Sequence, residues 1–199
     1  MLASLTAKRW VAAAQPNLMP IYRLGFNILA VLLLLPILWL TYRNPGPMLW
    51  RWQGIGAWLA NGLTLVAVVG FVQSLKYYDS EEFLGFRQWK SRSRRVEDQE
   101  HFHLSPFHRF VRHPWYFFAL VLIWTRDMSA ATLLSSAMMS VYFIIGSRLE
   151  ERKLLVYHGE VYRRYLLRVP GLMPLPWKYL TAEEASDFVG QAGGDDVTQ

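Results

Sequence analysis

Long uncharged stretches alternate with short polar segments along the chain. Three stretches, residues 21–41, 54–76 and 130–147, consist almost entirely of aliphatic, aromatic and small residues. At about 1.5 Å per residue, a helix over each would be about as long as the hydrocarbon layer of a membrane is thick, about 30 Å. A chain of 199 residues is too short to surround three such helices with a soluble core. The pattern therefore predicts an integral membrane protein.

A fourth apolar stretch, residues 114–129, directly precedes the last long one. Thr125, Arg126 and Asp127 predict a tight turn between the two, with residues 125–128 as its tip, so residues 114–129 and 130–147 should form a helical hairpin. Pro114 suits the first turn of a helix, where its missing N–H has no intrahelical partner to lose. We therefore expect an all-α integral membrane fold with about four transmembrane helices, of which the last two form the hairpin. A cytoplasmic loop and a C-terminal helical segment complete the expected fold.

The segments outside the apolar stretches divide the rest of the chain. Pro16 and Pro20 indicate that the N-terminal segment is an interfacial lead-in rather than a further span. The C-terminal segment, TAEEASDFVGQAGGDDVTQ, is acidic, rich in small residues and without an evident apolar face, so we expect it to be disordered. The predicted parts are the lead-in, a single membrane domain and the tail, at residues 1–20, 21–180 and 181–199.

Basic residues are distributed unevenly around the predicted spans. Of the 21 Lys and Arg residues, only Arg43, Arg51 and Arg126 lie in the two loops opposite the termini. Such a bias marks the cytoplasmic side. We therefore expect both termini, and segments 77–112 and 148–180, to be cytoplasmic, in a bacterial inner membrane. The net charge of +6 then reflects topology and contact with anionic membrane lipid, and no basic–aromatic pattern indicates nucleic-acid binding.

The chain has no cysteine, which excludes disulfides and a thiolate nucleophile of its own. His108 and His113 form one H-x4-H spacing, but the further histidine boxes of a membrane di-iron site do not follow. His101 and His103 are interpreted as a solvated pair in a loop, with a metal site as the alternative. We predict no metal site, and the pattern indicates no particular catalytic base.

Two polar clusters flank the hairpin. Arg112 and His113 precede it, and Glu150 and Glu151 follow it. The two arms of a hairpin begin and end at the same membrane face, so these clusters should meet. The free N–H groups of the first helical turn favour an anionic group, to which Arg112 adds positive charge. An inward carboxylate near a membrane needs a cationic partner, although simple anchoring of helix ends is the alternative.

The residues around the hairpin resemble a known family. RHPWY, a hairpin, and then EERKLLVYHGEVYRRYLLRVPGLMP are similar to the C-terminal signature of the membrane-integral S-adenosylmethionine-dependent methyltransferases, the superfamily of isoprenylcysteine carboxyl methyltransferase and the phospholipid methyltransferases. The likeness covers residues 102–176 and looks closest to the bacterial branch of methanethiol S-methyltransferases. There are two departures: Ser105-Pro106-Phe107 replaces the usual Gly-Pro-Tyr, and His158-Gly159 replaces Phe-Gly.

The resemblance implies S-adenosylmethionine as cofactor and in-line methyl transfer to an apolar acceptor, which is a thiol or carboxylate of a small molecule, lipid or prenylated cysteine. It implies that residues at the hairpin entry form the cofactor pocket, that the twin glutamates hold ribose hydroxyls or the amino group, and that two tyrosines close the pocket. With Arg112, which is expected to attract the carboxylate, the predicted cofactor-binding residues are Arg112, His113, Pro114, Tyr116, Glu150, Glu151, Tyr162 and Tyr165. Two alternatives stay open: a membrane NADPH-dependent reductase of the sterol-reductase type, and a non-catalytic membrane assembly or regulatory protein.

Overall fold

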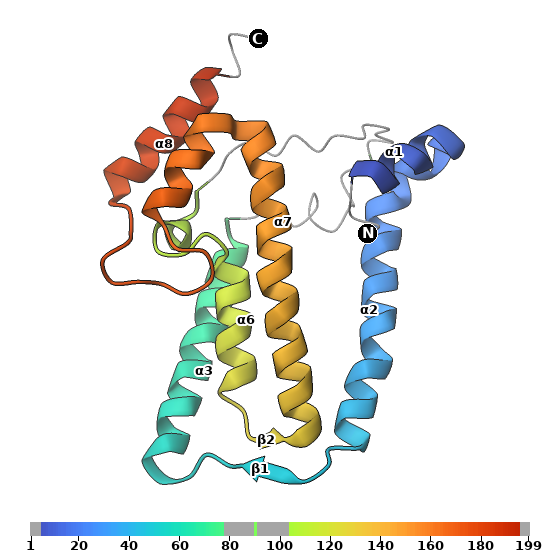
Figure 1. Ribbon diagram of the computed structural model, residues 1–199, viewed down its shortest axis with the longest axis vertical. Coiled ribbons are helices and arrows are strands. Elements are labelled where there is room, and N and C mark those ends of the chain that lie inside the picture. The colour runs from blue at the N-terminus through green and yellow to red at the C-terminus, as the bar shows by residue number, and fades with distance from the viewer. Residues whose placement is uncertain (1–4, 78–89, 91–103, 196–199) are drawn as a thin grey trace. The chain divides into compact units, whose positions relative to one another are not determined.

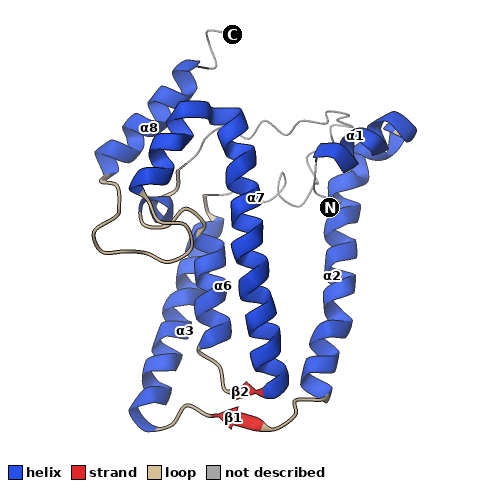
Figure 2. Ribbon diagram, in the orientation of Figure 1, coloured by secondary structure: helices blue, strands red, loops and turns tan. Residues whose placement is uncertain are grey.

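The structure is a computed structural model that describes residues 5–77, 90 and 104–195, with side chains described over 9–77, 90 and 104–190. The described part of the chain is almost entirely helical (Figures 1 and 2). The chain divides into two compact units, Met1–Asn44 with Tyr78–Gln99 and Pro45–Tyr77 with Glu100–Gln199, which are described separately below. The loop that contains His101 and His103 lies outside the described residues.

The first unit contains a short helix and a long apolar one. Helix α1 (Leu5–Ala14) leads through the 3-10 turn η1 (Pro16–Leu18) into α2 (Met19–Arg43), which contains the predicted span 21–41. Most apolar side chains of α2 are exposed, among them Leu33 and Trp39 at 60% and 63%. An apolar helix with its side chains exposed along its length fits a lipid environment and not water.

The second unit holds the remaining described elements. In chain order these are β1 (Met48–Trp50), α3 (Gly54–Leu75), η2 (Pro106–Arg109), α6 (Pro114–Trp124), β2 (Met128–Ser129), α7 (Ala130–Arg168) and α8 (Ala182–Asp195). Helices α3, α6 and α7 run alongside one another, and the chain turns from α6 into α7 at β2 (Figure 1). The predicted hairpin therefore corresponds to α6 and the first part of α7.

Helices α3 and α6 pack through a small-residue contact. A Cβ atom on Gly70 would lie 2.6 Å from two ring atoms of Phe118, so only glycine permits this approach. One turn further along α3, the hydroxyl of the fully buried Ser74 accepts a hydrogen bond from Trp115 Nε1 at 2.8 Å. Close backbone approach at a small residue, with a polar group bridging the helices, is typical of packing in membranes.

The far end of the hairpin is a short two-stranded sheet. Strands β1 and β2 pair antiparallel, and the Trp52 backbone N–H donates to Asp127 Oδ1 at 3.1 Å. The predicted arm 114–129 is helical only as far as Trp124, and the chain leaves the helix at the predicted tip, residues 125–128. There the Thr125 hydroxyl donates to the carbonyl of Val121 at 2.8 Å, and residues 125–129 form the turn and β2. Pairing with β1, which the periodicity of one segment cannot reveal, accounts for this difference.

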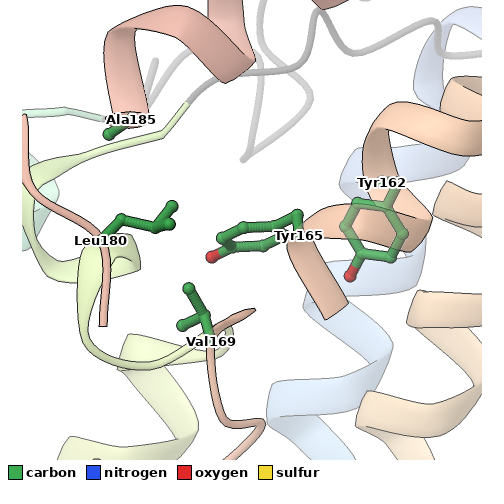
Figure 3. Close-up of a cluster of buried hydrophobic side chains, with 5 residues drawn as sticks. All are labelled: Tyr162, Tyr165, Val169, Leu180 and Ala185. Atoms are coloured by element: carbon green, nitrogen blue, oxygen red, sulfur yellow. The ribbon is translucent and has the colours of Figure 1, made fainter. Parts of the chain in front are cut away.

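Helix α7 bends sharply near its C-terminal end. Gly159 has φ +50° and ψ −124°, a backbone conformation that glycine adopts at little cost and other residues rarely adopt. The part of α7 after Gly159 turns back and lies beside α8 (Figure 1). Its buried side chains join residues from the following loop and α8 in a hydrophobic cluster (Figure 3), formed by Tyr162, Tyr165, Val169, Leu180 and Ala185.

The C-terminal segment differs from its prediction. It was expected to be disordered, but Ala182–Asp195 form helix α8. Thr181 and Glu184 form a reciprocal capping box, in which the Thr181 N–H donates to Glu184 Oε2 at 2.8 Å and the Glu184 N–H donates to Thr181 Oγ1 at 3.2 Å. Ala185 is buried in the hydrophobic cluster and Phe188 packs against it. These contacts give the segment the apolar face that its composition did not indicate.

Three helical segments of the described chain are long and apolar enough to cross a membrane: Pro16–Arg43, Gly54–Leu75 and the helix Ala130–Arg168. Helix α6 is apolar but shorter, at 11 residues. The prediction of an all-α integral membrane protein is confirmed.

Candidate active site

His113 lies at the N-cap of α6, and we call this end of the helix its mouth. The imidazole side chain is 6% exposed, and the backbone N–H donates to the carbonyl of Gly171 at 3.1 Å. The N–H of Arg112 donates to the carbonyl of Pro170 at 2.8 Å. The segment that follows α7 thus passes across the mouth, and its hydrogen bonds fix the backbone of Arg112 and His113.

Glu151 brings the two predicted clusters together. Its Oε1 atom accepts from Arg112 Nε at 2.8 Å and lies 2.8 Å from Arg112 Nη2 and 3.1 Å from His113 Nε2. Burial alone would raise the pKa of Glu151, but the hydrogen bond from His113 and the positive charge of Arg112 outweigh it and hold the pKa below its usual value. The carboxylate therefore lies ionised between the Arg112 guanidinium and the His113 imidazole.

The pKa of His113 is shifted in the opposite direction. Burial alone would lower it, but hydrogen bonds to Glu150 and Glu151 and the charges of these carboxylates outweigh burial and raise the pKa above its usual value. The cluster therefore favours imidazolium over neutral imidazole. The mouth of α6 thus carries charges of both signs, from the Arg112 guanidinium and the Glu151 carboxylate.

Arg112 also connects this ion pair to the end of α7. Its Nη1 atom donates to the carbonyl of Leu166 at 3.0 Å and to the carbonyl of Val169. Carbonyls at the end of a helix have no intrahelical donor, so Arg112 satisfies groups that burial would otherwise leave costly. All three guanidinium nitrogens thus donate within the protein. Arg112 joins the mouth of α6, the α7 carboxylate and the end of α7.

Glu150 is in a different environment from its neighbour. Its side chain is 48% exposed, against 16% for Glu151. Its contacts are longer: Oε2 lies 3.4 Å from His113 Nδ1 and 3.5 Å from the Tyr116 hydroxyl that donates to it. Of the two adjacent acids, Glu150 is the one available to a ligand.

A stack of three aromatic rings lies below these charges. The Tyr116 ring is parallel within 11° to the His113 imidazole, at 5.4 Å, and within 15° to the Phe143 ring, at 4.8 Å. Phe143 comes from α7, so the stack connects the two arms of the hairpin. Sequence reasoning missed Phe143. Its spacing of seven residues before Glu150 places both on one side of α7 and was a usable signal.

The two predicted tyrosines occupy the buried end of α7. Both are 2% exposed. The Tyr165 ring lies in the hydrophobic cluster, with its hydroxyl donating to the carbonyl of His108 at 2.7 Å (Figure 3). Burial raises the pKa of the Tyr162 hydroxyl, and the negative charge of Glu151 raises it further, so Tyr162 is within electrostatic reach of the ion pair. Both tyrosines thus belong to the hydrophobic cluster, and Tyr162 also borders the charged cluster.

The segment before the mouth has a structural function. Ser105 caps η2 reciprocally with His108, whose Nδ1 lies 2.8 Å from the Ser105 hydroxyl. The Phe107 ring packs edge-on against Phe118 at 5.4 Å. The two histidines of the H-x4-H spacing therefore have different partners: His108 caps the 3-10 turn, and His113 contacts Glu150 and Glu151. Within the described residues, no group of three or more His, Cys, Asp or Glu side chains has the arrangement of a metal site.

Fold and site together define a class: an integral membrane protein whose helical hairpin carries an ionised acid–imidazole cluster at its mouth. Methanethiol S-methyltransferase 2 of Bradyrhizobium diazoefficiens is 30% identical over 176 residues, which are 87% of this chain and 67% of that protein. Methanethiol S-methyltransferase of a Pseudomonas strain is 29% identical over 182 residues, which cover 87% and 66% of the two chains. The chain thus spans about two thirds of the length of these relatives. The chain belongs to the family of methanethiol S-methyltransferases, and a methyltransferase activity follows from this membership.

Another relative has a higher identity over a shorter aligned segment. Methanethiol S-methyltransferase 1 of Bradyrhizobium diazoefficiens is 40% identical over 72 residues, which are 36% of this chain and 25% of that protein. No family model matches the chain, and no solved structure matches it significantly.

Proposed function

We propose that the protein transfers a methyl group from S-adenosylmethionine to the sulfur of a small apolar thiol at the membrane. The observation that carries this proposal is the exposed Glu150 carboxylate beside the ionised His113–Glu151 cluster, at the mouth of an apolar hairpin. The relatives named as methanethiol S-methyltransferases support a thiol as the acceptor.

The side chains at the mouth suit such a cofactor. S-adenosylmethionine has an ammonium group, ribose hydroxyls, a carboxylate and a sulfonium. Glu150, with half of its side chain exposed and only long contacts, can accept hydrogen bonds from the ammonium or from ribose hydroxyls. The N–H group of Tyr116 lies in the first turn of α6 and can donate to the carboxylate.

Arg112 has a different part in this proposal from the one predicted from the sequence. Since its nitrogens donate to Glu151 and to α7 carbonyls, we assign it the positioning of Glu151 instead of contact with the cofactor. Tyr162 supports the same cluster from the returning part of α7. The group that remains open to the ligand on α7 is Glu150.

The chemistry is an in-line displacement. When bound, the sulfonium supplies an electrophilic methyl group. With the cofactor held at Glu150 and the first turn of α6, the acceptor thiol would give its proton to solvent and its sulfur would take the methyl group, with the thioether as the leaving group. The protein contributes alignment of the two reactants and exclusion of water. We assign no side chain as the base.

A site at the membrane surface would be accessible to both the acceptor and the cofactor. An apolar acceptor partitions into the bilayer, whereas the cofactor arrives from water. We propose that the mouth of α6 faces the cytoplasm of a bacterial inner membrane, in keeping with the excess of Lys and Arg on the loops at this side.

Methyl transfer can be measured directly. The purified full chain in lipid nanodiscs is incubated with methanethiol and isotopically methyl-labelled S-adenosylmethionine, and labelled dimethyl sulfide is detected in the headspace by mass spectrometry. We expect Glu150→Gln to reduce turnover by at least tenfold. The matched control is Glu160→Gln, which changes a 70% exposed carboxylate on the same helix and should leave turnover unchanged.

A binding experiment separates this proposal from its alternatives. Calorimetry with S-adenosylhomocysteine should show saturable binding, and NADPH should show none. Binding of NADPH alone would establish the reductase instead. Absence of binding and of turnover in the folded, inserted protein would reject the methyltransferase proposal.

A further inference from the structure

The loop after α7 is tied at both ends to the chain just before α6. At one end, the Pro170 and Gly171 carbonyls accept from the Arg112 and His113 N–H groups at 2.8 and 3.1 Å. At the other end, the Leu180 N–H donates to the Arg109 carbonyl at 2.9 Å, and Arg109 Nε donates to the Leu180 carbonyl at 3.0 Å. Residues 172–179 between these ties, which we call the mouth loop, are therefore held at the level where α6 begins.

The mouth loop directs large apolar side chains outward. Met173, Trp177 and Tyr179 are 57%, 73% and 48% exposed. Phe110, which is 46% exposed, stacks on Tyr179 with 6.1 Å between ring centroids and 24° between planes. Leu180, directly after the loop, is fully buried, so the chain returns to the core immediately after these exposed aromatic residues.

The exposed side is also ordered. A bridge between Leu175 and Lys178, with a backbone hydrogen bond of 3.0 Å, closes the tip of the loop. The guanidinium of Arg109 lies over the Phe110 ring, 5.5 Å from its centroid. The aromatic patch is thus a fixed surface flanked by positive charge.

The geometry points to the lipid interface as the partner of this surface. We infer that the mouth loop inserts Met173, Trp177 and Tyr179 into the boundary between headgroups and acyl chains of the leaflet at the mouth of α6. Trp and Tyr are enriched at this depth because their rings are apolar and their edges polar. Lys178 and Arg109 lie where they can meet anionic headgroups.

Insertion would link the bilayer to the candidate site. The first residues after α7 hold the backbone of Arg112 and His113, and the residues that follow at once would be anchored in lipid. The depth of the charged cluster relative to the headgroups would then be set by the loop as well as by the spans. This inference does not depend on the identity of the reaction.

The cysteine-free chain allows a clean test. Met173→Cys and Trp177→Cys are each labelled with an NBD fluorophore in the full chain, in nanodiscs of phosphatidylcholine and phosphatidylglycerol. Ser186→Cys on an exposed side of α8 is the matched control. Quenching is measured with aqueous iodide and with a lipid that carries a nitroxide at carbon 5 of its acyl chain.

We expect the labels at 173 and 177 to be quenched by the nitroxide lipid and to be several-fold less sensitive to iodide than the label at 186. Equal iodide quenching at all three positions would overturn the inference. Protection from iodide without lipid quenching would also overturn it, since it would show that a second copy of the chain covers the surface. Trp177→Ser provides a check without a label. It should make hydrogen exchange in the loop faster in nanodiscs, and an unchanged exchange rate would count against insertion.

Discussion

Replacing Arg112 with glutamine removes the fixed positive partner of Glu151 and the donor to the last carbonyls of α7. The Arg112 and Glu151 side chains are 14% and 16% exposed, so the pair is largely shielded from water. Removal of one partner from a buried pair costs about 3–5 kcal/mol. The contact between His113 Nε2 and Glu151 Oε1 at 3.1 Å remains in the variant, so we expect a loss at the lower end, about 3 kcal/mol. For a chain of this size, that corresponds to a decrease in Tm of roughly 6–12 °C.

A double-mutant cycle measures whether the two residues act as a unit. Tm of the ligand-free protein in nanodiscs is recorded for Arg112→Gln, Glu151→Gln and the double variant. We expect the double variant to lose less than the sum of the single losses, because it leaves no uncompensated charge. The matched control is Arg163→Gln. It removes the Arg163–Glu160 pair on α7, in which both side chains are 70% exposed, and it should leave the Tm unchanged.

Ligand binding separates positioning from direct contact. The affinity of Arg112→Lys is measured for S-adenosylhomocysteine and for its decarboxylated analogue. If Arg112 acts through Glu151, both affinities fall together and their ratio stays that of the unmodified protein. Two results together would refute the reasoning: an unchanged Tm in Arg112→Gln, and nearly equal affinities of Arg112→Lys for the two ligands. Equal affinities would mean that the carboxylate no longer contributes to binding, so Arg112 would be the residue that holds it.

Three further predictions concern pH and packing. Since the pKa of His113 is raised above its unfolded value, its contribution to stability is complete below about pH 6.5 and is lost as pH rises through the raised pKa; a Tm series from about pH 6 to 9 should decline less steeply in His113→Gln. Gly70→Ala should destabilise by about 1–3 kcal/mol, because its Cβ would lie 2.6 Å from a phenylalanine ring of α6, whereas Gly62→Ala on the same helix meets nothing within 4 Å and should show no such loss in thermal unfolding. Thr181→Ala should cost α8 about 1 kcal/mol and speed hydrogen exchange at its start, and unchanged exchange would show that the cap does not stabilise the helix.

The meeting of the two charged clusters was predictable because a membrane restricts hairpins. Two adjacent arms of similar length must begin and end at one face, so His113 and Glu151 had to be neighbours despite the intervening residues. The sequence did not indicate which of the adjacent acids turns inward. That choice depends on the rotation of α7 about its axis, which is set by packing against α6 through Tyr116 and Phe143.

Helix α8 was missed for a different reason. A judgement from composition outweighed a local signal, although Thr181 and Glu184 have the spacing of a capping box and Ala185 and Phe188 lie on one side of the resulting helix. The partners of these apolar residues, Tyr165 and Leu180, come from other segments of the chain. Composition measures the average polarity of a segment, whereas two well-placed apolar residues are enough to attach a short helix to an existing core.

The division of work between Glu150 and Glu151 follows from the same packing. A charged ligand can bind near a membrane at low cost only if the charges that meet it are already in place. Glu151 is held by Arg112 and His113 before any ligand arrives, and these contacts orient the imidazole that lies beside Glu150. In the proposed function, a ligand would bind the exposed Glu150 without breaking the buried Arg112–Glu151 pair. The two adjacent glutamates would then have different roles: Glu151 would hold the cluster together and Glu150 would contact the ligand.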